Sequence, residues 1–101
     1  MKTLKGSDRP ATNQLLAAFG EEASSHITPY LEPIEVRLGD MICEAGDLLT
    51  HAYFPQACVL SLLTVMENGS EIECANIGNE GAFGIFTAMQ GGPSSVRCLV
   101  Q

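Results

Sequence analysis

Residues 58–77, with the sequence CVLSLLTVMENGSEIECANI, decide the fold of this chain. Residues 58–66 are mostly aliphatic and include the β-branched types that favour strands, so they form the strongest predicted strand. Asn68 and Gly69 predict a hairpin turn, because both tolerate the positive φ that such turns need. Residues 70–77 are expected to return beside the first strand, with inner-face candidates that shift by one residue midway: Ile72, Cys74, Ala75 and Ile77.

Shorter apolar pieces precede this hairpin and are separated by turn residues. Residues 31–38 have a period of two, and residues 41–43 and 52–54 follow between turns that contain Gly, Asp or Pro. Several short strands with frequent turns predict a mainly β fold, a roll or sandwich with a few helices at its ends.

The N-terminal region predicts two short helices behind a disordered leader. Residues 1–11 are rich in Lys, Ser, Asp and Pro, a composition typical of a disordered segment. Thr12 or Asn13 is expected to cap the first helix, and Gly20 to end it. The second helix is expected from residue 21 to about residue 27, with acidic residues in its first turn, where the helix dipole favours them.

The charge balance argues against a chain that holds nucleic acid by itself. Five basic residues accompany twelve acidic ones among 101 residues, a formal net charge of −7. Phosphate binding depends on clustered Lys and Arg, so any DNA contact is expected from another segment or another chain. No signal peptide and no apolar run of membrane-spanning length is visible, so we expect a cytoplasmic protein without membrane contact.

Five short motifs occur in one order along the chain: GDMICEAGD at 39–47, HAYFP at 51–55, VLSLL at 59–63, ENGS at 67–70 and GAFG at 81–84. In that order they resemble the cyclic-nucleotide-binding domain of Crp/Fnr-type transcription regulators, over about residues 13–101. The resemblance implies a jelly-roll-like β-roll over residues 12–101, with short helices at its N-terminus and in a phosphate-binding cassette. It also implies the role of an effector-sensing domain in transcription regulation.

The resemblance places the ligand site in the cassette, here residues 81–97. The candidate ligand-binding residues are Gly81, Phe83, Gly84, Ile85, Ser94, Ser95 and Arg97. Cyclic-AMP-binding members have a Glu directly after the F-G pair, which takes the ribose 2′-hydroxyl, and a later Arg, which neutralises the phosphate. Ile85 stands at the Glu position and cannot accept that hydrogen bond. We therefore expect a small anionic effector or cyclic nucleotide to bind weakly or not at all, and expect no other cofactor.

Two further readings of the cassette stay open. Arg97 lies about one residue after the family's phosphate-binding Arg, and one residue along a strand turns a side chain to the opposite face. It either points into the roll and binds an anion or is a solvated strand residue. Ser94 and Ser95 either present hydroxyls and amides to the same anion or form a plain turn.

The other chemistry-bearing residues favour structural roles. The cysteines, Cys43, Cys58, Cys74 and Cys98, include no CxxC pair, so we expect small buried hydrophobes in a reducing compartment rather than a metal site. A cysteine-based redox sensor is the alternative. His26 and His51 have no partner at a metal-ligand spacing, and no nucleophile-plus-base arrangement is visible, so we expect no enzyme activity.

The family's domain normally continues with another hairpin, a long dimerisation helix and a helix-turn-helix. Because none of these follows in the sequence, we expect a domain that is incomplete at its C-terminus and contacts DNA only through a missing helix-turn-helix segment. Residues 96–101 then expose an unpaired strand edge, which predicts a homo-oligomer formed through them. A stand-alone module that pairs with homologues is the alternative.

Overall fold

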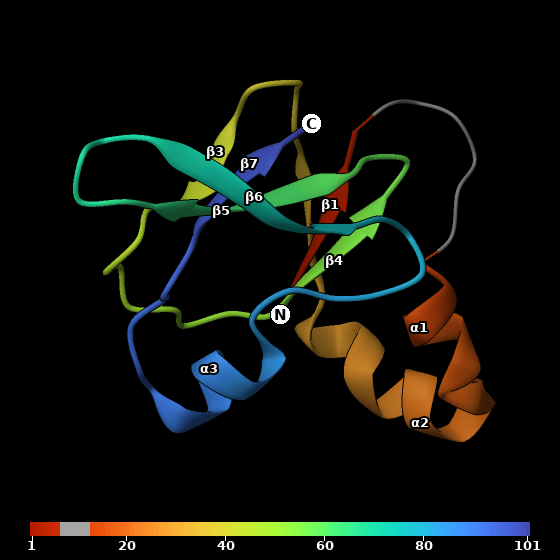
Figure 1. The fold of residues 1–101 in the computed structure, drawn as a ribbon. Helices are drawn as coiled ribbons and strands as arrows, with labels where there is room; N and C mark the ends of the chain where they lie inside the picture. The colour runs from red at the N-terminus through yellow and green to blue at the C-terminus, as the bar shows by residue number, and fades with distance from the viewer. Residues whose placement is uncertain (7–12) are drawn as a thin grey trace.

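The computed structural model describes residues 1–6 and 13–101 and is mainly β, with two sheets and short helices at one end (Figure 1). The strands are β1 (Lys2–Lys5), β2 (Glu32–Glu35), β3 (Met41–Cys43), β4 (Tyr53–Gln56), β5 (Leu60–Val65), β6 (Glu71–Ile77) and β7 (Arg97–Val100). The helices are α1 (Gln14–Ala18), α2 (Gly20–Ile27) and α3 (Ile85–Gln90), with a 3-10 turn over Thr28–Tyr30. The expected fold class is therefore confirmed.

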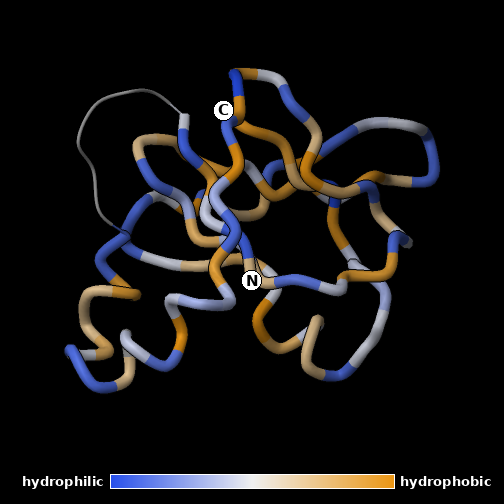
Figure 2. The backbone as a smooth tube through the Cα atoms, turned by 180° about the vertical axis from the view of Figure 1, so that it is seen from behind, coloured by the Kyte–Doolittle hydropathy of each residue, from blue (hydrophilic) through white to orange (hydrophobic). Residues whose placement is uncertain are grey.

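The strands form one parallel and one antiparallel sheet. The first has the order β2-β1-β4, and both of its pairings are parallel. The second has the order β3-β7-β5-β6 and is antiparallel. The core between them consists of Leu4, Val36, Cys43, Leu49, Leu60, Phe83, Cys98 and Val100. Figure 2 shows hydrophobic stretches along the strands and a hydrophilic tip on the β5–β6 hairpin.

The expectation of a disordered leader is wrong for residues 1–6. β1 is the central strand of its sheet, so both of its edges are hydrogen-bonded, and Leu4 is only 1% exposed. Lysines at positions 2 and 5 flank two buried residues, Thr3 and Leu4, so a charged composition conceals a strand that contributes to the core. Residues 7–11 of the expected leader lie outside the described residues.

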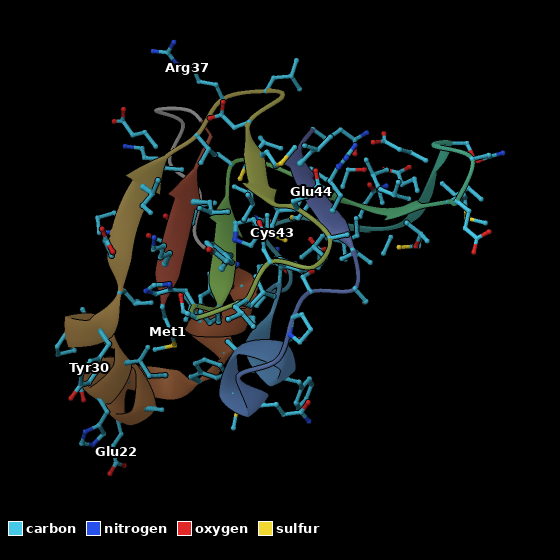
Figure 3. All side chains as sticks on the ribbon, turned by 90° about the vertical axis from the view of Figure 1, so that its left-hand side faces the viewer. Met1, Glu22, Tyr30, Arg37, Cys43 and Glu44 are labelled. Carbon is cyan, nitrogen blue, oxygen red and sulfur yellow. The ribbon has the colours of Figure 1, made fainter. Side chains whose placement is uncertain are left out.

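The β5–β6 hairpin is confirmed, including its shift of register. Leu62 pairs with Ala75 and Leu63 with Glu73, so Cys74 is the extra residue of a β-bulge. Of the four expected inner-face residues only Ile77 packs against the core. The hairpin projects beyond the body of the domain, which leaves Ile72 55% exposed (Figure 3).

The expectation of an unpaired edge at residues 96–101 is wrong. β7 lies between β3 and β5, and its residues pair on both sides. The physical reason is that β3, far earlier in the chain, pairs with the edge of β7 that does not face β5. Among the described residues, no helix is both long enough and apolar enough to span a membrane.

Candidate functional site

The cassette begins at a loop that is fixed to β4 through Phe83. The Phe83 N–H donates to the Tyr53 carbonyl and the Tyr53 N–H donates to the Phe83 carbonyl, both at 2.9 Å. The two rings stack with centroids 6.2 Å apart, and Phe83 is buried. Phe83 therefore anchors the cassette in the core, and its side chain is not presented to a ligand.

Asn13, expected only as a helix cap, also holds the start of the cassette. Its Oδ1 accepts the Leu16 N–H at 3.0 Å, which is the expected N-cap of α1. Its Nδ2 donates to the carbonyls of Gly81 (2.8 Å) and Pro55 (2.9 Å). Asn13 is 0% exposed, so one buried side chain joins α1, β4 and the cassette. The sequence signals the cap but not these long-range bonds.

Gly84 begins α3 in a conformation that requires glycine. Its φ is 85°, in the left-handed region, and a Cβ there would lie 3.2 Å from Leu49 Cδ1. The helix that follows has six residues, whose first amides have no partner within the helix.

Ile85, at the position of the family's Glu, is turned toward apolar surroundings. It lines a pocket of about 400 Å³ together with Phe19, Ile27 and Phe54 from the N-terminal helices and β4. The side chain is half-buried. The position therefore presents an apolar side chain to this pocket and provides no acceptor for a hydroxyl.

Ser94 and Ser95 differ in their surroundings. Ser94 is 5% exposed, and its Oγ donates to the Val96 carbonyl at 2.7 Å. Its N–H donates to the Asp47 carbonyl at 2.8 Å, so the residue holds two loops together. Ser95 is exposed on a bend. The Ser94 hydroxyl is thus committed to the turn, while that of Ser95 faces solvent.

Arg97 is held by two carboxylates on the sheet face away from the core. Its Nε donates to Glu44 Oε1 at 2.8 Å, and its Nη1 forms an ion pair with Glu71 (Figure 3 labels Glu44 beside β7). The neighbouring residue, Cys98, is the one that enters the core. The hydrogen bond from Arg97 lowers the pKa of Glu44 and raises that of Arg97.

The candidate residues therefore divide into two groups. One group forms the loop that leads into α3 and the first residue of that helix: Gly81, Phe83, Gly84 and Ile85. The other group contacts the segment after β3, where Ser94 bonds to Asp47 and Arg97 to Glu44. The arginine of the cassette, Arg97, is paired with two carboxylates and is therefore not free for an anion at the start of α3. Arg97, Glu44 and Glu71 together carry a net charge of −1, which disfavours the binding of an anion beside them.

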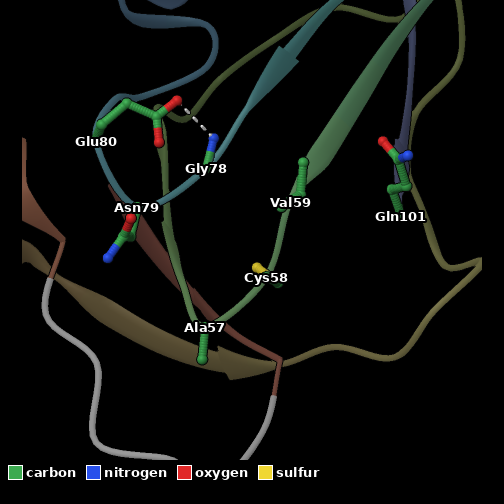
Figure 4. A pocket seen from close by; sticks show the side chains of 7 residues that line it. All are labelled: Ala57, Cys58, Val59, Gly78, Asn79, Glu80 and Gln101. Carbon is green, nitrogen blue, oxygen red and sulfur yellow. Dashed lines mark hydrogen bonds between the residues drawn. The ribbon is translucent and has the colours of Figure 1, made fainter.

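A second cavity, of about 470 Å³, lies where β4 leads into β5 (Figure 4). It is lined by Ala57, Cys58, Val59, Gly78, Asn79, Glu80 and Gln101. The Gly78 N–H donates to Glu80 Oε1 at 3.0 Å and holds the pKa of Glu80 below its ordinary value. Ala57 has a φ of 54°, a strained value for a residue other than glycine. No sequence motif pointed to this cavity.

The cysteines have the surroundings of packed hydrophobes, except Cys74. Burial raises the pKa values of Cys43 and Cys58, and it raises that of Cys98 to about 12. All four are free thiols, and Cys74 is exposed at the β6 bulge. Within residues 1–6 and 13–101, no three His, Cys, Asp or Glu side chains gather into a group that could hold a metal ion.

Comparison with solved structures gives the same fold. The N-terminal domain of a transcriptional regulator from Streptomyces coelicolor A3(2) superimposes with a TM-score of 0.72 and 21% identity, over 87% of this chain and 61% of that chain. The Catabolite Activator Protein of Thermus thermophilus gives 0.71 and 20%, over 86% of this chain and 41% of that chain. The sequence matches no protein-family model and no curated protein. The expected Crp/Fnr-type β-roll is thus confirmed as a fold.

Proposed function

We propose that this chain is the effector-sensing domain of a Crp/Fnr-type transcription regulator. The observation that supports the proposal is the superposition of about seven-eighths of the chain on the regulator domains. The chain spans 61% and 41% of the two proteins that it matches, so the regulator's output is assigned to segments outside this fold.

DNA contact, in this proposal, is made by another segment or chain. The net charge of −7 opposes approach to a phosphate backbone. Arg97, one of the five basic residues, is paired with two carboxylates. Arg97 is therefore not available for a phosphate, and DNA binding depends on clustered Lys and Arg side chains.

The effector, in this proposal, is a small anion that binds weakly at the start of α3. A nucleotide would lack the acceptor that the family's Glu supplies, because the Ile85 side chain has no polar atom. A missing charge-assisted hydrogen bond costs about 1.5–3 kcal/mol, roughly ten- to a hundredfold in affinity. The phosphate would also have to compete with Glu44 and Glu71 for Arg97.

A thermal-shift screen with small anions tests the proposal. Cyclic AMP, cyclic GMP, inorganic phosphate and short carboxylates are added to the chain at up to ~10 mM, against matched sodium chloride controls. An effector with a dissociation constant of about 1 mM stabilises the fold by roughly 1.4 kcal/mol at that concentration. The expected result is stabilisation by at least one anion, retained in Arg97→Gln. No stabilisation by any of them would reject an effector site.

A redox sensor, the alternative, is not supported by three of the four cysteines, and Cys74 is the exposed thiol that it would have to use. The thiolate is the reactive form of cysteine, and the raised pKa values of Cys43, Cys58 and Cys98 keep these groups protonated at neutral pH.

A further inference from the structure

The pocket that Ile85 lines has the size and lining of a small-molecule site. It measures about 400 Å³ and takes its residues from α3, the N-terminal helices and β4, and Figure 1 shows the three helices at the same end of the fold. Two of the lining residues, Ala52 and Phe54, are buried, at 7% and 2% exposure. Small-molecule pockets typically measure roughly 300–1,000 Å³ and are lined mainly by hydrophobic side chains, with a few polar groups that fix orientation.

Large apolar side chains of this α3 pocket remain in contact with water. Phe19 is 39% exposed and Met89 is 80% exposed, although both line the pocket. An apolar occupant removes such surface from water, and the gain in free energy grows with the area covered. Methionine is unbranched and adapts its shape to what it packs against. The lining therefore favours a mainly apolar occupant over water.

The polar groups of the pocket are a threonine and a histidine. Thr50 Oγ1 and His51 Nδ1 are hydrogen-bonded to each other at 2.8 Å. Among residues 1–6 and 13–101, nothing bonds to the other ring nitrogen, His51 Nε2, which can donate or accept according to the tautomer. The described lining residues include no Asp, Glu, Lys or Arg. An ionised group would lose its water here without a charged side chain to replace it, which is costly.

We propose that the α3 pocket binds a neutral, mainly apolar small molecule that carries one hydroxyl or carbonyl group. The polar group bonds to His51 Nε2, and the apolar part covers Phe54, Ile85 and Met89. The proposal is independent of an anion at the start of α3, because Gly84 and Arg97 do not line this pocket.

Titration of the full chain with 1-octanol, followed by the methyl NMR signals of Ile85, Ala88 and Met89, tests the proposal. All three residues line the pocket, so their signals should shift together and saturate, with a dissociation constant of about 0.1–1 mM. Octanoate and octylammonium have the same chain with an ionised head group at neutral pH. They should bind at least roughly tenfold more weakly, because the pocket supplies no charged side chain for them.

Two variants identify the site. Ala88→Leu fills part of the pocket and should weaken 1-octanol binding at least roughly tenfold. Ala75→Leu is its matched control, because it adds the same atoms at an exposed position on β6, outside the pocket. His51→Phe keeps an apolar ring but removes the hydrogen bond, and should weaken binding roughly two- to tenfold. Circular dichroism checks that each variant folds, and His51→Phe carries the test if Ala88→Leu does not.

Four outcomes would overturn the proposal. The first is shifts that do not saturate, which would mean that the pocket takes up no occupant. The second is 1-octanol binding that Ala75→Leu weakens as much as Ala88→Leu does, and the third is binding that His51→Phe leaves unchanged. The fourth is octanoate or octylammonium that binds more tightly than 1-octanol, which would refute a neutral ligand. A thermal shift with phosphate or a cyclic nucleotide bears on the anion site alone.

Discussion

Replacement of Asn13 by alanine should destabilise the whole domain rather than fray one helix. The side chain is 0% exposed and makes three hydrogen bonds, to the Leu16 N–H and to the carbonyls of Pro55 and Gly81. Alanine removes all three hydrogen bonds, and their backbone partners at Leu16, Pro55 and Gly81 lie in buried or partly buried positions. Because these groups belong to α1, β4 and the cassette, their loss affects all three elements together.

The expected cost is about 3 kcal/mol, since each buried hydrogen bond of this kind contributes roughly 1 kcal/mol. For a domain of this size such a loss lowers the melting temperature by roughly 12–24 °C. It is also a large share of the 5–15 kcal/mol that stabilises a typical domain. The variant should therefore remain folded at 20 °C but unfold well below the wild type.

Urea unfolding followed by circular dichroism measures this cost. The matched control is Asn68→Ala, because Asn68 also accepts hydrogen bonds from its neighbour Ser70 (3.0 Å to N and 2.6 Å to Oγ) but is exposed in the hairpin turn. We expect less than about 1 kcal/mol there. If Asn13→Ala cost no more than Asn68→Ala, the reasoning that joins α1 to the cassette through this side chain would be refuted.

Three further results are expected. Gly84→Ala should lose roughly 1 kcal/mol more than Gly91→Ala, because both have positive φ (85° and 70°) but only at Gly84 would a Cβ crowd a leucine methyl 3.2 Å away; equal losses in urea unfolding would contradict this. Glu44→Gln should lower the free energy of unfolding above pH 4.5, the ordinary pKa of the carboxyl, because Arg97 loses a charged partner. The difference in stability between wild type and variant should vanish as pH falls through the lowered pKa of Glu44, where the wild-type carboxylate is protonated. A difference that persists in acid would count against the ion pair. Cys98, whose pKa burial raises to about 12, should resist thiol-specific labelling at pH 8 until the chain unfolds; rapid labelling in the folded state would contradict this.

Much of the fold could be predicted because the relevant signals are local. The Asn68–Gly69 turn and the aliphatic run before it define the β5–β6 hairpin. The sequence also indicates the bulge, because the alternation of apolar residues shifts by one position between Cys74 and Ala75. β1 was missed because its strand character depends on two parallel partners far away in the sequence, and four residues with two lysines carry no local strand signal.

The candidate site could be located but its chemistry could not. The glycines and Phe83 mark the cassette because the backbone needs glycine at Gly84 and the core needs an aromatic ring at Phe83. The partners of Arg97 depend on which face of β7 it occupies and on two residues far earlier in the chain, Glu71 in β6 and Glu44 directly after β3, 26 and 53 residues before it. Asn13 shows the same limit, since its bonds to β4 and the cassette exist only in the folded chain.

A titration of isotope-labelled chain with cyclic AMP, followed by amide NMR shifts, tests whether this effector-sensing domain binds nucleotide only weakly. We expect fast-exchange shifts around Gly84 and α3, with a dissociation constant weaker than about 100 µM, and no change at the side-chain resonances of Arg97. Saturation at low micromolar cyclic AMP, with Arg97 released from its carboxylates, would show instead that the nucleotide site is intact despite Ile85.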